Sequence, residues 1–220
     1  IALCVIAYCG WYIWQYWHGH ELGDSLKDNW GGGSEDITAK SVEIPVDFDS
    51  LHEVNPEIYA WIYIPGTDIS YPVLQHDGDN GYYTRRAEDG NYLTVLYGHN
   101  LRSGKMFAQL NDFSDVNVFD EHRYIYIYTP DKMLVYEIFA AYPFSHRHLL
   151  LNYDFTDPAQ FDAFFDDVMY KPGLSSNFMD NVELDGTKDK ILTLSTCLRG
   201  DNQQRYLVQG RLISEIPAKK

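Results

Sequence analysis

Short segments rich in aromatic and β-branched residues recur along most of the chain, and turn-forming residues separate them. WIYI at 61–64 and SYPVL at 70–74 flank a Pro-Gly turn, and RYIYIYT and KMLVYEIFAAY flank Pro130-Asp131. Such segments favour strands, and such turn residues favour hairpins. The pattern therefore predicts a mainly β fold, as a barrel or a sandwich, with helices inserted between strands.

The clearest helix signal lies at 157–171, DPAQFDAFFDDVMYK. Asp157 is a good N-cap residue, Pro158 suits the first helical position, and the Phe residues that follow share one face. We also expect helix starts at Asp49 and Asn55, and a short helix in KMFAQLNDF. Two further strands are predicted after the helix at 157–171, ILTLSTC at 191–197 and RYLVQGRLI at 205–213.

The N-terminal residues 1–17, IALCVIAYCGWYIWQYW, carry no charged side chain and concentrate Trp in their second half. A spanning helix needs about 20 apolar residues, and Trp is enriched at the membrane interface. We therefore expect 1–17 to be a truncated membrane anchor, with a buried core helix or a signal-peptide core as the alternatives. Polar residues 18–43, which include a Gly-Gly-Gly-Ser run, predict a linker, and 44–220 form the folded domain.

The overall charge excludes one class of partner. The formal net charge is −15, from 17 Lys and Arg against 32 Asp and Glu. A nucleic-acid surface needs clustered Lys and Arg. We therefore expect no nucleic-acid partner.

The end of the 191–197 strand carries a cysteine, Cys197, which is the only cysteine outside 1–17. Arg205 begins the next predicted strand after a connection of seven residues, 198–204. If these strands are antiparallel neighbours, both side chains lie at one end of the sheet. A nearby cation activates a thiol, and an Arg can stabilise an oxyanion. An inert buried thiol and a surface Arg are the alternatives.

A cysteine nucleophile usually needs a histidine. His99 ends the predicted strand 92–99 directly after Gly98, which permits tight backbone geometry. His146 and His148 have a spacing that can bind metal, but two ligands fall short of a complete site, so we expect a solvated loop there and no metal.

The combination of TLSTC, an Arg eight positions after the Cys, and YGHN upstream resembles the sortases, most closely class B. LYGHNLRSGKMFAQL and AWIYIPGTDISYPVLQ are also similar to segments of that class, and the resemblance covers about 47–213. It implies a sortase-type β-barrel of about seven to eight strands, with N-terminal helices and a long helix before the Cys strand. It makes 44–220 the catalytic domain.

The resemblance also implies roles for individual residues. Cys197 matches the nucleophile, His99 the catalytic histidine and Arg205 the family's arginine. The positions that match substrate-binding residues are Asn80, Ser195 and Thr196. Asp201 lies in the predicted loop between Cys and Arg, and its role stays open.

The implied activity is that of a cysteine transpeptidase without cofactor. It would cleave a C-terminal sorting signal of a secreted protein after Thr, through a thioacyl-enzyme, and transfer the protein to an amine of peptidoglycan precursor or of a pilin. Class B signals lean toward Asn-Pro-x-Thr-Asn. With the anchor, this predicts a single-pass protein of the cell membrane with an extracellular catalytic domain. Hydrolysis by the same residues, or a non-catalytic binding domain on this scaffold, are the alternatives.

One departure from the class B pattern lies at 84–96. Relatives of that class have a longer stretch here with a further strand. A lost strand would expose a sheet edge beside the groove.

Overall fold

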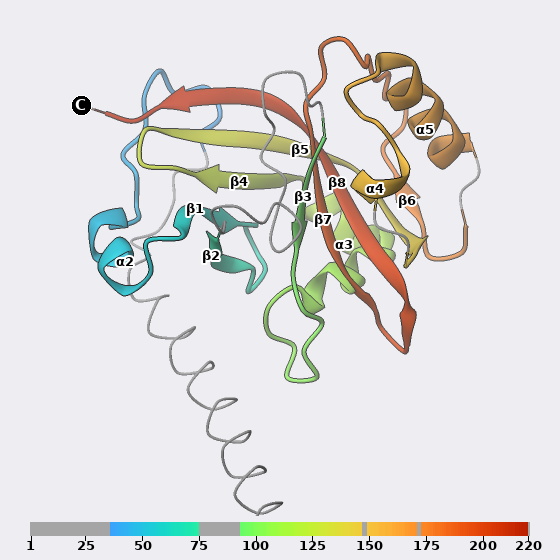
Figure 1. The fold of residues 1–220 in the computed structure, drawn as a ribbon, viewed down its shortest axis with the longest axis horizontal. Coiled ribbons are helices and arrows are strands. Elements are labelled where there is room, and N and C mark those ends of the chain that lie inside the picture. The colour runs from blue at the N-terminus through green and yellow to red at the C-terminus, as the bar shows by residue number, and fades with distance from the viewer. Residues whose placement is uncertain (1–35, 75–92, 147–148, 171–172, 220) are drawn as a thin grey trace, which may run out of the picture.

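The computed structural model describes residues 36–74, 93–146, 149–170 and 173–219. They form one strongly curled mixed sheet with short helices around it (Figure 1). The strand order is β2-β1-β4-β5-β8-β7-β3, and β6 pairs with β5 outside this path. All pairs are antiparallel except β3 with β7, which is parallel.

The strand bounds follow the aromatic and β-branched segments of the sequence. The strands are β1 Ile58–Tyr63, β2 Ser70–Leu74, β3 Leu93–Tyr97, β4 Tyr124–Tyr128, β5 Lys132–Ser145, β6 Asn177–Phe178, β7 Ile191–Leu198 and β8 Asp201–Pro217.

Two long strands, β5 and β8, run through the centre of the sheet and give it its curvature. Their pairing shifts register between Val135 and Tyr136 and again between Ile138 and Ala140. Such irregularities bend a strand and increase its twist. The sheet therefore curls around an interior of apolar side chains, which include Ile62, Leu96, Ile125 and Leu194.

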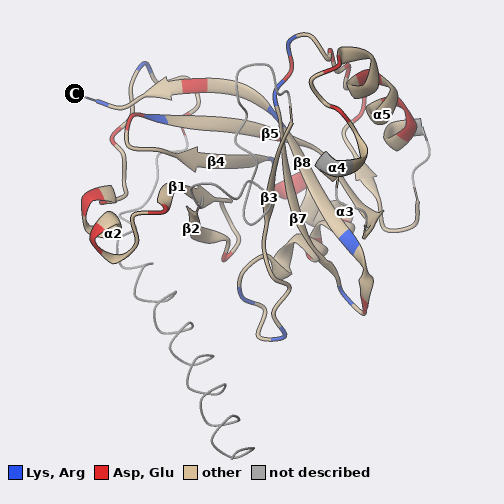
Figure 2. Ribbon diagram, viewed as in Figure 1, with Lys and Arg blue, Asp and Glu red and all other residues tan. Residues whose placement is uncertain are grey.

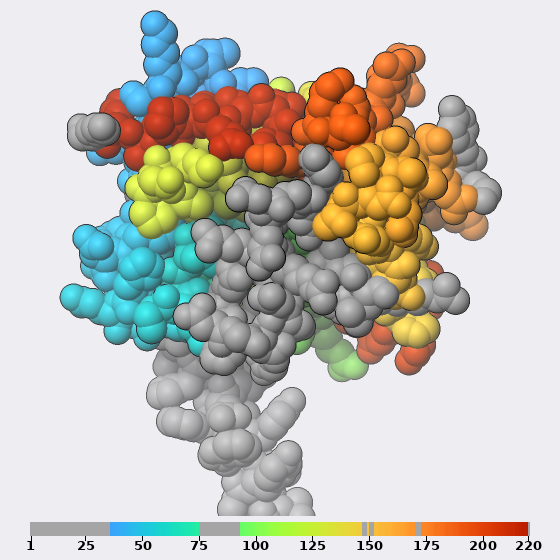
Figure 3. Space-filling model, turned by 45° about the horizontal axis from the view of Figure 1, so that its top comes forward, coloured from blue at the N-terminus to red at the C-terminus, as the bar shows by residue number. Residues whose placement is uncertain are grey.

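The helices cover different parts of the sheet. They are α2 Phe48–Val54, the 3₁₀ helix η1 Ala108–Ser114, α3 Val116–Glu121, α4 Leu149–Asn152 and α5 Pro158–Tyr170. α2 packs with β1, β4 and the start of β5, while α4 and α5 pack with β3, β7 and the second half of β5. Figure 3 shows the first described residues lying along the C-terminal strand, where Val42 pairs with Ala218.

The predicted fold class is confirmed: the chain is mainly β, with a barrel-like curled sheet and inserted helices. The helix expected at 157–171 is α5. KMFAQLNDF differs in detail, because its first three residues are not helical, and the part from Ala108 is a 3₁₀ helix. The loop expected at 198–204 is also different, since β8 already begins at Asp201 and leaves only Arg199 and Gly200 as the turn. Gly200 has φ +88°, a conformation that favours glycine.

The predicted location in a cell membrane is corrected by the structure. In the four described ranges, no helix is long and apolar enough to cross a membrane. The longest helix there, α5, has 13 residues, whereas a span needs about 20. The predicted anchor at 1–17 lies outside the described residues, as do Asn80 and most of the short 84–96 stretch. The linker and domain boundaries stay predictions.

Candidate active site

The β7–β8 hairpin places Cys197 directly opposite Arg205. The two residues are cross-strand partners in the antiparallel register. An Arg205 guanidinium nitrogen donates a hydrogen bond to the Cys197 sulfur at 2.6 Å, and both side chains are partly buried. A fixed cation therefore lies beside the sulfur, at the end of the sheet.

His99 reaches the same place through β3. Because β3 runs parallel to β7, with Tyr97 beside Ser195, the residues after Tyr97 leave the sheet next to the end of β7. The Gly98 N–H still donates to the Ser195 carbonyl, at 3.0 Å. His99 follows as an exposed side chain. Residues far apart in the sequence thus meet at one sheet end.

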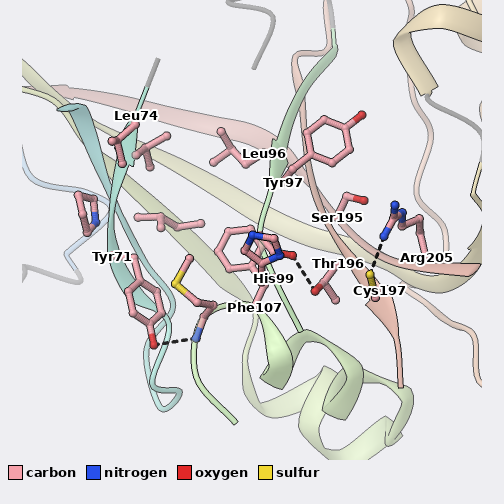
Figure 4. A pocket seen from close by; sticks show the side chains of 15 residues that line it. Tyr71, Leu74, Leu96, Tyr97, His99, Phe107, Ser195, Thr196, Cys197 and Arg205 are labelled. Atoms are coloured by element: carbon pink, nitrogen blue, oxygen red, sulfur yellow. Dashed lines mark hydrogen bonds between the residues drawn. The ribbon is translucent and has the colours of Figure 1, made fainter. Parts of the chain in front are cut away.

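A cavity of about 500 Å³ joins these residues. Figure 4 shows Tyr71 and Leu74 of β2 on one side, Tyr97, Ser195 and Arg205 on the other, and His99 between them. Apolar side chains supply most of the remaining wall, namely Ile62, Val73, Leu96, Met106 and Phe107. Such a mostly apolar groove with a few convergent polar groups suits an extended peptide.

A smaller cavity, of about 50 Å³, continues past Arg205 toward α4. Tyr97, Ser195 and Arg205 line both cavities. Partial burial raises the pKa of Tyr97 to about 12, although the positive charge of Arg205 lowers it. His146 lines only the smaller cavity, and its partner in the predicted pair, His148, lies outside the described residues.

The backbone around His99 is held by several specific contacts. The Thr196 hydroxyl donates to the Gly98 carbonyl at 2.8 Å, and the Phe107 N–H donates to the His99 carbonyl at 3.0 Å. The ring of Phe107 lies where a Cβ at position 98 would be, so a side chain there would clash with it. These contacts fix the loop that carries His99 against β7.

The predicted site residues are distributed as follows. His99, Cys197 and Arg205 line one cavity together with Ser195 and Thr196. Thr196 is 2% exposed and its hydroxyl is engaged with Gly98, so it acts on the backbone of the site.

The Asp201 carboxylate accepts from the Gln203 N–H at 2.8 Å and from the Gln204 side chain at 2.9 Å, so it is engaged within β8.

Other contacts of the site were not predicted from the sequence. The amides of Asn100 and Asn111 both donate to the Cys197 carbonyl. The hydroxyl of Tyr71 accepts from the Met106 N–H at 3.1 Å. The one signal for Asn100 is its place directly after His99. Asn111 and Tyr71 give none, because their contacts depend on the folded sheet.

The site carries groups for thiol chemistry. Within the described ranges, no group of three or more His, Cys, Asp or Glu side chains is placed to hold a metal ion. The polar groups at the groove include a thiol, a guanidinium and an imidazole. This set fits nucleophilic attack by sulfur with charge stabilisation and proton transfer.

Comparison with known proteins decides the family. The model of the sortase domain matches residues 62–213, which is more than half of the chain. The chain belongs to the sortase family. The predicted resemblance is thereby confirmed.

Several sortases B are similar to this sortase over most of its length. Sortase B of Listeria monocytogenes is 26% identical over 242 aligned residues. The alignment covers 98% of this chain and 95% of the Listeria protein. The solved sortase B of Clostridium perfringens has a TM-score of 0.65 at 26% identity, covering 76% of this chain and all of its own. A solved sortase B complexed with triglycine has a TM-score of 0.62 at 26% identity. The match covers 76% of this chain and 85% of the chain in that structure. The chain is therefore a class B-like cysteine transpeptidase.

Proposed function

We propose that this sortase cleaves a sorting signal after its Thr through a thioacyl on Cys197, and then transfers the acyl group to an amine. The observation that carries the proposal is the 2.6 Å contact between the Arg205 guanidinium and the Cys197 sulfur, inside a peptide-sized groove that His99 also lines.

In the first step, the Cys197 thiolate attacks the carbonyl carbon of the substrate Thr, and the carbonyl oxygen becomes negatively charged. Arg205 donates hydrogen bonds to this oxyanion, where a preorganised positive charge is most effective. When the C–N bond breaks, His99 as imidazolium gives its proton to the departing amine. A thioester to Cys197 and a new amine terminus are the products.

In the second step, an acceptor amine attacks the thioester carbonyl. His99, now neutral, takes the proton of this amine, and the thiolate of Cys197 leaves. The acceptor would be an amine of peptidoglycan precursor or of a pilin. The triglycine complex of a related sortase B supports an acceptor amine on a glycine, which has no side chain beside it.

The remaining substrate contacts follow from the groove. Ser195 lines both cavities, and we infer that it contacts the bound signal next to the reacting carbonyl. Asn80 and Thr196 stay predictions as substrate-binding residues. A secreted protein with a C-terminal Asn-Pro-x-Thr-Asn-like signal is the expected donor.

Replacing the nucleophile tests the proposal. We expect Cys197→Ala to abolish cleavage of an Asn-Pro-x-Thr-Asn peptide, as followed by chromatography of the products, because no other described side chain of the groove is a comparable nucleophile. The matched control is Ser50→Ala, which removes a hydroxyl that donates to the Asp47 carboxylate at 2.7 Å in α2, outside the cavity lining. Cleavage by Cys197→Ala at the wild-type rate would contradict the proposal.

A further inference from the structure

The carbonyl of the nucleophile itself has an unusual set of partners. Along β7, carbonyls two residues apart point to the same side, so those of Ser195 and Cys197 both face the β3 side. The Ser195 carbonyl accepts from the Gly98 N–H at 3.0 Å. The Cys197 carbonyl instead accepts from two side-chain amides, that of Asn100 at 2.9 Å and that of Asn111 at 3.3 Å.

Every polar group of the Asn111 side chain is used in this arrangement. The residue is 5% exposed and comes from η1. Its side-chain oxygen accepts from the Arg199 N–H at 2.7 Å, and its NH₂ group also donates to the Ala108 carbonyl at 3.4 Å. A carbonyl oxygen has two lone pairs, and the amides of Asn100 and Asn111 fill both on Cys197.

On the other side of β7, the pairing with β8 is irregular at the same point. The β7–β8 register shifts between Cys197 and Leu198, where the partner changes from Arg205 to Asp201. The regular register therefore ends at the nucleophile on this side, and pairing resumes with Leu198 opposite Asp201. On the β3 side, where the strand pairing ends after the Gly98–Ser195 hydrogen bond, the two amides bind the Cys197 carbonyl, and Asn111 also binds the Arg199 N–H beyond the register shift.

We propose that Asn100 and Asn111 are positioning residues that hold the Cys197 backbone for the transfer reaction. They set where the sulfur lies relative to Arg205. Because Asn100 directly follows His99, its bond to the Cys197 carbonyl also fixes the loop of the histidine against the strand of the nucleophile. The inference rests on the proposed function, since it gives Asn100 and Asn111 a task only if Cys197 is the nucleophile.

Loss of the amide donors should slow the chemistry more than it weakens peptide binding. We expect Asn100→Ala and Asn111→Asp to lower kcat for peptide transfer to triglycine by about 10- to 100-fold, since small displacements of reacting groups have effects of this order. KM for the peptide should stay within about twofold, because the groove wall is unchanged. Asn111→Asp keeps the acceptor for Arg199 but removes both donors.

The matched control is Asn177→Asp. It removes a comparable hydrogen bond, which the Asn177 side-chain amide donates to the Phe113 carbonyl of η1 at 2.7 Å, away from Cys197. Its kcat should stay within about twofold of wild type. Thermal unfolding of all variants shows whether they are folded, and if buried Asn111→Asp does not fold, Asn100→Ala tests the same carbonyl from a more accessible position.

Two results would overturn the inference. One is wild-type kcat in folded Asn100→Ala, and the other is a loss of kcat in Asn177→Asp as large as in Asn111→Asp, which would indicate a purely structural effect through η1. Failure of the proposed function is distinguishable, because in that case Cys197→Ala would itself remain active.

Discussion

At the scale of single residues, the site depends on one cross-strand pair. The register of β7 and β8 places Arg205 opposite Cys197, and the guanidinium reaches the sulfur at 2.6 Å. The planar guanidinium presents several donors in a fixed fork, whereas the ammonium of Lys is a point charge on a flexible stem. Oxyanion stabilisation therefore needs the geometry of Arg205 and not only its charge.

The variant Arg205→Lys tests this requirement. We expect the rate of thioacyl formation to fall by about 10- to 100-fold, because charge is kept but the paired donors to the oxyanion are lost. Single-turnover kinetics with the sorting peptide measures that rate. Arg211→Lys is the control, since Arg211 lies on the same strand and bonds to the Glu183 carbonyl at 3.3 Å, away from the cavity. If Arg205→Lys were as fast as wild type, charge alone would be sufficient.

The sequence predicted part of this residue-level picture. The end of one strand and the start of the next brought Cys197 and Arg205 together, and the family motif pointed to His99. Asn100 and Asn111 were missed because their hydrogen bonds to Cys197 cross 97 and 86 residues of sequence, respectively. Local pattern carries no information on such contacts.

At the scale of secondary-structure elements, the loop after β3 positions His99. This loop leaves the sheet at Gly98, and the ring of Phe107 packs where a side chain on residue 98 would lie. Phe107 is 5% exposed and belongs to the interior cluster, so it has little room to move. The close approach of the ring therefore requires glycine at position 98.

We expect Gly98→Ala to lower both stability and activity. Overpacking against Phe107 should reduce the free energy of unfolding by about 1–3 kcal/mol, as measured by urea denaturation. Displacement of the neighbouring His99 should lower kcat as well. Gly173→Ala is the control, because among the residues that the structure describes a Cβ there meets only the Ser176 hydroxyl oxygen, at 3.7 Å. Unchanged stability in Gly98→Ala would mean that the Phe107 ring can move aside.

Local patterns predicted some elements well and others wrongly: the helix starts expected at Asp49 and Asn55 were wrong, because Asp47 caps the start of α2 and Asn55 its end. Helix α5 follows from its cap, its proline and its aromatic face. The short strand β6 was missed, since its residues Asn177 and Phe178 are strand only through pairing with β5. The early start of β8 at Asp201 was missed because GDNQQ has the composition of a loop, and the glycine turn at Gly200 continues the hairpin instead.

At the scale of the whole molecule, the curled sheet explains how distant segments form one groove. β2 and β3 lie at opposite ends of the strand order, yet both line the large cavity. Figure 2 shows acidic residues on α2 and α5, in line with the net charge of −15. The general fold class could be predicted from strand-like segments, but the curvature could not, because it arises from irregular pairing of β5 with β8.

The central claim is acyl transfer through Cys197, and intact-mass spectrometry of the 220-residue chain with an Asn-Pro-x-Thr-Asn peptide tests it most directly. We predict a mass increase equal to the acyl fragment ending in Thr, located on Cys197 and absent in Cys197→Ala. Addition of triglycine should remove the adduct and yield the peptide joined to triglycine by an amide bond. An adduct on another residue, or release of only the free acid when triglycine is present, would contradict acyl transfer through Cys197.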